Sequence, residues 1–422
     1  MFLLYNFVLT ILSPFWIAWM LFRTAQRKEK PIWGERFGNY SFEFRKDRKR
    51  IWIHAVSVGE VVATIPVLKQ LRTRLPDYEL VLSVTTSSGH QTAIERAKGL
   101  YDHLVYFPID VTRFMMVAMQ KVQPAVVITI DTELWRNFVF SAKAFRATTM
   151  LVNGRISDRS FPLASKVAFF YRDLMKDVDQ CLMQTEVDAE RIKALGGHNV
   201  SIMGNVKFDQ AVDGLDANPA EWHEKLKLPQ GRPVVVIGST RGAEEENFVL
   251  QGLKEYGLDK ISVVHAPRHL ERVPELSAAV RAAGGDLALR SKGESGSYLI
   301  LDTYGELGQV FCVADVAIIG GGFAKLGGQN LMQPLAHGKP VIHGPYMHNF
   351  RDVAQLAEQA GATRTVRTPA ELATVMKELM DSPETRAKMG DAARAIIAAN
   401  VGASERCAEA IAVAAERSEA RK

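Results

Sequence analysis

Short apolar runs alternate with segments of helical spacing along most of the chain. Residues 61–75, VVATIPVLKQLRTRL, are typical of the helical segments, with apolar side chains three and four positions apart. The strand-like runs of the first half are IWIHAVS (51–57), LVLSVTT (80–86), AVVITI (125–130), TMLVNGR (149–155), CLMQT (181–185) and SIMGNV (201–206). Near-continuous apolar strands separated by helices predict a parallel sheet that is covered by helices on both faces.

The same alternation restarts after a less apolar connector, residues 207–232, which contains two prolines and is followed directly by a third, Pro233. The strand-like runs of the second half are PVVVIGST (233–240), ISVVHAPR (261–268), YLILDT (298–303), VAIIGGG (316–322) and KPVIHGP (339–345). We therefore expect an α/β protein with two doubly wound domains, residues 51–206 and 233–382, followed by C-terminal helices over 383–422. Their ligands should bind in a cleft beyond the carboxyl ends of the strands.

The N-terminus differs from this pattern. Residues 1–22 carry no charge, and as a helix they would span about 33 Å, so they predict a membrane anchor. Residues 1–50 contain ten Lys or Arg and four acids, whereas the whole 422-residue chain has a net charge of +5. The basic segment 23–50 thus favours an anionic membrane surface over nucleic acid, with the domains on the cytoplasmic side. A helix lying in the membrane interface is the alternative.

The spacing of cysteines and histidines argues against a disulfide-stabilised protein and against a metal-binding protein. The three cysteines are far apart, which argues against a disulfide framework and a thiolate metal site. The ten histidines show no H-E-x-x-H spacing. We therefore predict no bound metal and no other cofactor.

Acidic side chains follow two strands of the first half. Glu60, in HAVSVGE, lies in the first turn of a predicted helix, where the helix dipole favours an ionised carboxylate. Asp131 and Glu133 follow the run AVVITI directly. Each is either an ordinary acid at the end of an element or a catalytic group at the mouth of a cleft, and position alone does not decide between the two.

The second half holds candidate binding residues for an anion. Arg268 and His269 follow a strand, and a planar guanidinium can clamp a phosphate. Residues 320–334, GGGFAKLGGQNLMQP, combine two glycine clusters with Asn330, which resembles a helix cap. The segment matches neither a P-loop nor a G-x-G-x-x-G fingerprint. Because a helix N-terminus at a cleft is an anion site, a phosphate is the expected ligand.

Several motifs resemble, in order and spacing, those of the 3-deoxy-D-manno-octulosonic acid (Kdo) transferases of lipopolysaccharide assembly. They are HAVSVGE, the TELW core of DTELWRN, NGRISDRS, GNVKFD, APRH, GEL and GGQN…P…AHGKPVIHGP…NFRD. The resemblance covers nearly the whole chain, including the apolar start. It implies a GT-B glycosyltransferase of the bacterial inner membrane, with an N-terminal Rossmann-like domain for the lipid A precursor and a C-terminal one for the donor, CMP-Kdo.

The resemblance also implies roles for residues. Glu60 corresponds to the catalytic base of an inverting, metal-independent transfer, and Glu133 to a second essential acid. Arg155 and Lys207 are candidates for pairing with the carboxylate of Kdo. Contacts with the nucleotide map to Arg268, His269, Tyr304, Gly305, Glu306, Asn330, Leu331, Met332 and Gln333.

Four positions depart from the family pattern. The family usually has Glu at Gln333, His at Gln329 and Arg241, and Pro at Arg136. Since an amide accepts a hydrogen bond less strongly than a carboxylate, these changes bear on donor affinity more than on the base. Two alternatives remain open: another GT-B enzyme that uses a UDP-sugar, and a membrane-tethered binding protein that has lost its activity.

Overall fold

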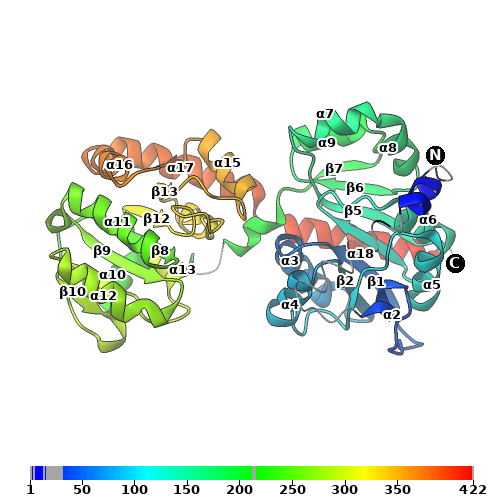
Figure 1. The fold of residues 1–422 in the computed structure, drawn as a ribbon, viewed down its shortest axis with the longest axis horizontal. Coiled ribbons are helices and arrows are strands. Elements are labelled where there is room, and N and C mark those ends of the chain that lie inside the picture. The colour runs from blue at the N-terminus through cyan, green and yellow to red at the C-terminus, as the bar shows by residue number, and fades with distance from the viewer. Residues whose placement is uncertain (1, 3–4, 13–14, 16–31, 212–214, 421–422) are drawn as a thin grey trace. The chain divides into compact units, whose positions relative to one another are not determined.

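In the computed structural model, residues 2, 5–12, 15, 32–211 and 215–420 are described (Figure 1). Contacts divide the chain into two compact units. The first unit consists of Met1–Asp209 and Asn400–Lys422, and the second of Gln210–Ala399. Both are layered α/β structures, and each contains a seven-stranded sheet.

The sheet of the first unit has the strand order β3-β2-β1-β4-β5-β6-β7, and all its pairings are parallel. This is the doubly wound order, in which the connections reverse direction between β1 and β4. The strands are β1 (Lys49–Ala55), β2 (Tyr78–Val84), β3 (His103–Tyr106), β4 (Val126–Ile130), β5 (Thr148–Gly154), β6 (Gln180–Met183) and β7 (Val200–Ile202).

Helices cover both faces of this sheet, as the continuous apolar strands predict. Alternate residues of a strand serve opposite faces, so Ile53 packs in one core and its neighbour Trp52 packs against Phe138 in the other. The helices are α2 (Trp33–Arg36), α3 (Val58–Arg74), α4 (Ser87–Arg96), α5 (Thr112–Val122), α6 (Arg136–Ala144), α7 (Ser160–Lys166), α8 (Ala168–Met175) and α9 (Glu186–Ala194).

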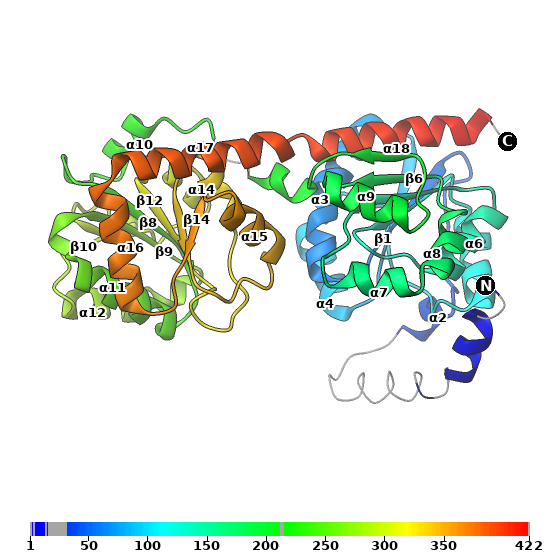
Figure 2. The same cartoon turned by 90° about the horizontal axis from the view of Figure 1, so that it is seen from above.

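The C-terminal helix also belongs to the first unit. Figure 2 shows α18 (Ala403–Ala420) lying along it, and Ile411 packs in the same core as Leu68 of α3. Arg74 and Glu405 form an ion pair of 2.9 Å between the two helices. The two helices expected over 383–422 are thus divided, because α17 (Pro383–Asn400) lies almost wholly in the second unit.

The second sheet has the order β10-β11-β9-β8-β12-β13-β14, and its pairings are also parallel. It differs from the first at both edges: two strands, β11 and then β10, lie beyond β9, whereas only β3 lies beyond β2, and three strands rather than four lie on the other side of the reversal. The strands are β8 (Val234–Thr240), β9 (Ser262–Pro267), β10 (Leu287–Leu289), β11 (Tyr298–Ile300), β12 (Val316–Ile319), β13 (Val341–His343) and β14 (Thr363–Thr365).

Two long helices, α11 (Ala243–Tyr256) and α16 (Pro369–Asp381), contribute to the core of the second unit. Leu253 and Leu372 pack with Val235 and Ile318 of the sheet, and both helices contribute to this core. The helices of the unit are α10 (Pro219–Lys225), α11 (Ala243–Tyr256), α12 (Val273–Ala282), α13 (Leu307–Val310), α14 (Met332–Ala336), α15 (Arg351–Gln359), α16 (Pro369–Asp381) and α17. The predicted fold class, with two parallel α/β sheets, is therefore confirmed.

The predicted membrane anchor is not confirmed. No helix in the described part of the chain is long and apolar enough to cross a membrane, and much of the predicted span 1–22 lies outside the described residues. Residues 5–12 form a helix on the first unit. Tyr5 donates to Asp110 at 2.7 Å, and the Asn6 amide donates to Asn137 at 3.0 Å. These polar residues explain why the start of the chain is less apolar than a typical span.

Candidate active site

Two acids meet at the point where the first sheet reverses direction. Glu60 follows β1 and Glu133 follows β4, and these two strands are neighbours. Ser57 caps α3, and its hydroxyl donates to Glu60 at 2.8 Å while the Val56 N–H donates at 2.7 Å. The Trp135 indole N–H donates to Glu133 at 2.9 Å. Both carboxylates are therefore held in place at the carboxyl ends of the strands.

This arrangement changes the acidity of Glu60. Burial and the neighbouring Glu133 carboxylate raise the pKa of Glu60 to about 7, and Asp131 adds to the increase. The hydrogen bonds from Val56 and Ser57 oppose it only in part. Burial also raises the pKa of Glu133. A carboxylate with a pKa near 7 is well suited to accept a proton at neutral pH.

Asp131 and Asn153 shape the turn beside these acids. Both have a left-handed backbone, with φ of 58° and 57°, a conformation that Asn and Asp tolerate better than most residues. The Asn153 side-chain NH₂ donates to the Asp131 carboxylate at 2.6 Å, and the Asn153 side-chain oxygen Oδ1 accepts from the Val206 N–H at 3.1 Å. The sequence drew attention to both residues but did not indicate this supporting role. The available signal was that Asp131 lies directly after β4 and that Asn153 lies near the end of β5.

The two candidate cations lie on backbone that adjoins this turn. Arg155 lies directly after β5, and its N–H donates to the Asp131 carbonyl at 3.3 Å. Lys207 lies in a short 3₁₀ turn, Val206–Gln210, whose first residue is bonded to Asn153. The Lys207 ammonium makes no hydrogen bond or ion pair with a described residue, so it is available for a ligand.

In the second unit, the glycine stretch lies where the sheet reverses between β8 and β12. A Cβ on Gly320 would lie 2.5 Å from Thr240 Cα, and one on Gly344 would lie 2.1 Å from the Gly322 oxygen. Close backbone packing thus requires glycine at these positions. Gly321, Gly327 and Gly328 have positive φ. The close neighbour of Gly320 and of Gly344 is thus the chain's own backbone.

Glu245 organises this loop, and the sequence did not reveal it. Its carboxylate is fully buried at the start of α11 and accepts four backbone N–H groups. The donors are Arg241 at 2.8 Å, Gly321 at 2.6 Å, Phe323 at 2.9 Å and Ala324 at 3.3 Å. The run of three acids in GSTRGAEEE was a visible signal, but nothing in it distinguished the buried Glu245 and Glu246 from the exposed Glu244.

The residues assigned to the nucleotide lie on loops at the carboxyl ends of the second sheet. Arg268 and His269 follow β9 and are exposed. Tyr304 is 77% exposed, and Gly305 beside it has a φ of 87°. Although burial favours protonation of Glu306, hydrogen bonds from Arg290 and Thr303 lower its pKa. Glu306 is thus ionised and paired with Arg290, which lies in the separate turn Arg290–Lys292.

The start of α14 carries the remaining assigned residues. The N-cap of α14 is Leu331, which makes no side-chain cap, rather than the expected Asn330. The Asn330 side chain, one residue earlier, accepts from the Met332 N–H at 2.9 Å. The side chains of Leu331 and Met332 are buried, at 0% and 2% exposure. Only their backbone groups are therefore available to a ligand. Gln333 is partly exposed at the same turn.

Two of the departures from the family pattern have local structural roles. Arg136 is buried and pairs with Asp173 at 3.3 Å and Asp177 at 2.7 Å, which makes it a structural residue. The Arg241 guanidinium donates to the Leu326 carbonyl beside the glycine loop at 3.5 Å. Among the described residues, no group of three or more His, Cys, Asp or Glu is placed to hold a metal ion.

Comparison with known proteins identifies the family. Residues 32–210 match the family model of 3-deoxy-D-manno-octulosonic-acid transferase (kdotransferase). A 3-deoxy-D-manno-octulosonic acid transferase from Bordetella pertussis is 34% identical over 86% of this chain and 86% of its own. A bifunctional glycosyltransferase/methyltransferase from Fusobacterium nucleatum is 30% identical over 80% of this chain. This chain spans only about half of that relative, 54%.

Solved structures support the same fold. MurG from Acinetobacter baumannii is similar with a TM-score of 0.58, covering 86% of this chain and 99% of its own at 12% identity. At that identity the similarity concerns the fold alone. The match to the Bordetella enzyme covers enough of the chain to include residues of both units. The chain thus belongs to the family of 3-deoxy-D-manno-octulosonic acid transferases and is a glycosyltransferase.

Proposed function

We propose that this protein transfers Kdo from CMP-Kdo to a sugar hydroxyl of a lipid A precursor, lipid IVA, with inversion and without a metal. Family membership supports the Kdo donor. The observation that carries the mechanism is the pKa of Glu60, raised to about 7 at the carboxyl ends of β1 and β4.

Glu60 acts as the general base. It accepts the proton of the acceptor hydroxyl while the hydroxyl oxygen forms a bond to the anomeric carbon of Kdo. The bond from that carbon to the phosphate oxygen breaks, and CMP leaves with the electron pair. Glu133 stays close to the base and raises its pKa, and a raised pKa makes proton transfer more favourable.

The second unit holds the nucleotide in this proposal. Arg268 supplies a guanidinium and the turn at Asn330 supplies backbone N–H groups, both of which stabilise phosphate charge as it develops. His269 and the 304–306 loop complete the site. The glycine loop held by Glu245 positions these groups, because a preorganised site need not rearrange as the reaction proceeds.

The proposed location is the cytoplasmic face of the inner membrane, and exposed apolar side chains favour attachment to a lipid surface. Phe7, Ile11 and Phe15 at the N-terminus are 63%, 54% and 77% exposed. On α7 and α8, Leu163 and Phe169 are 61% and 57% exposed. Tyr5 contacts Phe170, with ring centroids 5.5 Å apart, so the N-terminal helix and α8 are neighbours. Burying such residues in lipid is favourable and brings the enzyme to a lipid acceptor.

The test is a transfer assay with lipid IVA and a system that generates CMP-Kdo, read by mass spectrometry. Glu60→Ala should lower the rate at least about a hundredfold, the usual contribution of a general base, while CMP affinity stays within about twofold. Glu95→Ala, on the exposed side of α4, is the control and should keep full activity. Transfer from UDP-sugars but not from CMP-Kdo would favour the alternative enzyme. Equal rates for Glu60→Ala and the parent protein would remove Glu60 from the mechanism.

A further inference from the structure

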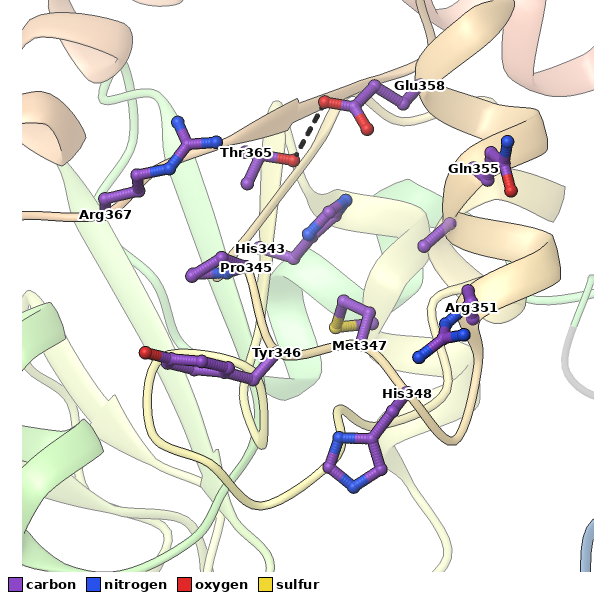
Figure 3. Close-up of a pocket in the computed structure, with 11 residues that line it drawn as sticks. His343, Pro345, Tyr346, Met347, His348, Arg351, Gln355, Glu358, Thr365 and Arg367 are labelled. Atoms are coloured by element: carbon purple, nitrogen blue, oxygen red, sulfur yellow. Dashed lines mark hydrogen bonds between the residues drawn. The ribbon is translucent and has the colours of Figure 1, made fainter. Parts of the chain in front are cut away.

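A pocket lies in the second unit of the chain. It is formed by residues other than those assigned to the nucleotide. It occupies the carboxyl ends of β13 and β14 and has a volume of about 360 Å³. Figure 3 shows side chains surrounding it from the 343–348 loop, from one face of α15 and from the end of β14. None of the residues that the family resemblance assigns to CMP or to catalysis lines it.

Two arginines give the pocket its positive charge. Arg351 begins α15 and Arg367 follows β14, and they approach the pocket from opposite sides (Figure 3). Neither guanidinium makes a hydrogen bond or an ion pair with a described residue. In contrast, Arg364 on the same strand is paired with Glu378 at 3.4 Å. An arginine pair without partners, facing one cavity, favours a carboxylate or phosphate ligand.

The floor of the pocket adds a hydrogen-bond acceptor. His343 is 2% exposed, and its Nδ1 lies 2.8 Å from the Gly344 carbonyl oxygen. Because a carbonyl only accepts, Nδ1 carries the proton and Nε2 has a free lone pair. Nε2 is buried without a partner among the described residues. Burial lowers the pKa of His343, which keeps the ring neutral and Nε2 an acceptor.

A carboxylate adds a second acceptor. Glu358 of α15 accepts from the Thr365 hydroxyl at 3.1 Å and has capacity for further donors. An anion without hydroxyl groups, such as acetate, would face this carboxylate with no donor to offer it. A ligand that carries both an acid group and hydroxyl groups satisfies the arginines, Glu358 and His343 together. His343 Nε2 is the buried acceptor of the pair, and because an unpaired buried acceptor is costly, a ligand hydroxyl that donates to it gains most there.

We propose that the pocket of His343, Arg351, Glu358 and Arg367 is a subsite for a hydroxylated carboxylate, a sugar acid. Its carboxylate pairs with the two arginines, and its hydroxyls donate to Glu358 and to His343. The identity of that acid as Kdo rests on the proposed function. In that case the cations for the Kdo carboxylate come from the second unit, in place of Arg155 or Lys207.

The experiment is a titration of the full-length protein by calorimetry and ligand-observed NMR. The probes are free Kdo, mannose, which lacks the acid, acetate, which lacks the hydroxyls, inorganic phosphate, and CMP. Kdo should bind at least about tenfold more tightly than mannose, acetate or phosphate. Arg351→Gln and Arg367→Gln should each weaken Kdo binding about tenfold, the effect of losing one charge-assisted hydrogen bond.

Matched variants show whether the two arginines of the pocket are the cations that bind the sugar acid. Arg281→Gln, at an exposed position of α12, should leave Kdo affinity unchanged, as should Lys207→Gln and Arg155→Gln. CMP affinity should stay the same in all five variants, and their thermal unfolding should match that of the parent protein. Unchanged Kdo affinity in both pocket variants, or phosphate binding as tight as Kdo, would overturn the proposal. Kdo binding that depends on the arginines without any CMP binding would leave the subsite standing and contradict the proposed donor.

Discussion

In both sheets a glutamate lies at the turn where the connections reverse direction, Glu60 in the first unit and Glu245 in the second. The two carboxylates have different roles. In the first unit, Glu60 accepts one backbone N–H and one hydroxyl, remains partly exposed and has a raised pKa. In the second unit, Glu245 is fully buried and accepts four backbone N–H groups. A carboxylate at such a turn can thus act as a base where its oxygens remain accessible. Where backbone N–H groups occupy its oxygens, it stabilises the loop instead.

The strongest destabilisation should follow from replacing Glu245, which removes its hydrogen bonds to the loop backbone. Glu245→Ala leaves four backbone N–H groups without an acceptor, and each unsatisfied buried group costs about 1–3 kcal/mol. We expect the free energy of unfolding of the second unit to fall by at least about 4 kcal/mol. Chemical denaturation followed by circular dichroism measures it. Glu244→Ala, at the exposed neighbouring position, should change stability by less than about 0.5 kcal/mol. Similar losses for both variants would contradict the structural role of Glu245.

Glycine substitutions at the corresponding turns should have a smaller effect on stability. In Gly320→Ala, the new Cβ would meet Thr240 Cα at 2.5 Å, and such overpacking costs about 1–3 kcal/mol. In Gly59→Ala, the Cβ would lie 3.9 Å from Ser57 Oγ, inside α3. We expect this second change to be neutral or stabilising, since Ala favours a helix. Melting temperatures of the two variants give the comparison, and an equal decrease in both would contradict it.

The smallest effect should be that of Glu133→Gln, which should shift the pH profile of kcat/KM. Since the Glu133 carboxylate raises the pKa of Glu60, Glu133→Gln should lower that pKa and move the acidic limb of kcat/KM to lower pH. The rate at high pH can fall as well, because Glu133 is a candidate catalytic acid. Glu95→Gln, on α4, should leave the limb in place. An unchanged limb or an upward shift in Glu133→Gln would show that the Glu133 charge does not raise the pKa of Glu60.

Sequence patterns predicted the two sheets well for a physical reason. Strands buried on both faces must be apolar throughout, so runs such as residues 125–130 are hard to mistake. Long-range packing was not visible in the same way. Nothing in the Ala-rich C-terminus separates α18, which packs against α3, from α17, because both helices are similarly patterned.

The candidate site was predictable where chemistry depends on position after a strand. Asp131 and Glu133 were identified because acids at strand ends are costly unless solvated, paired or used. Glu60 was identified because it lies in the first turn of a helix that follows a strand. Glu245 was missed because its partners, such as Gly321 and Phe323, are about eighty residues away. The pocket at His343 was missed for the same reason, since β13, α15 and β14 form it only after folding.

Whether Glu60 is the base can be decided from the pH dependence of kcat/KM for Kdo transfer, measured from pH 5.5 to 8.5 for the parent protein and for Glu60→Gln. A base must be deprotonated to act, so a pKa raised to about 7 predicts activity that falls about tenfold per pH unit below that value. Glu60→Gln should lose this limb together with at least about 99% of the rate. A parent profile that is flat through pH 7, or an acidic limb that survives intact in Glu60→Gln, would contradict the assignment of Glu60 as the base.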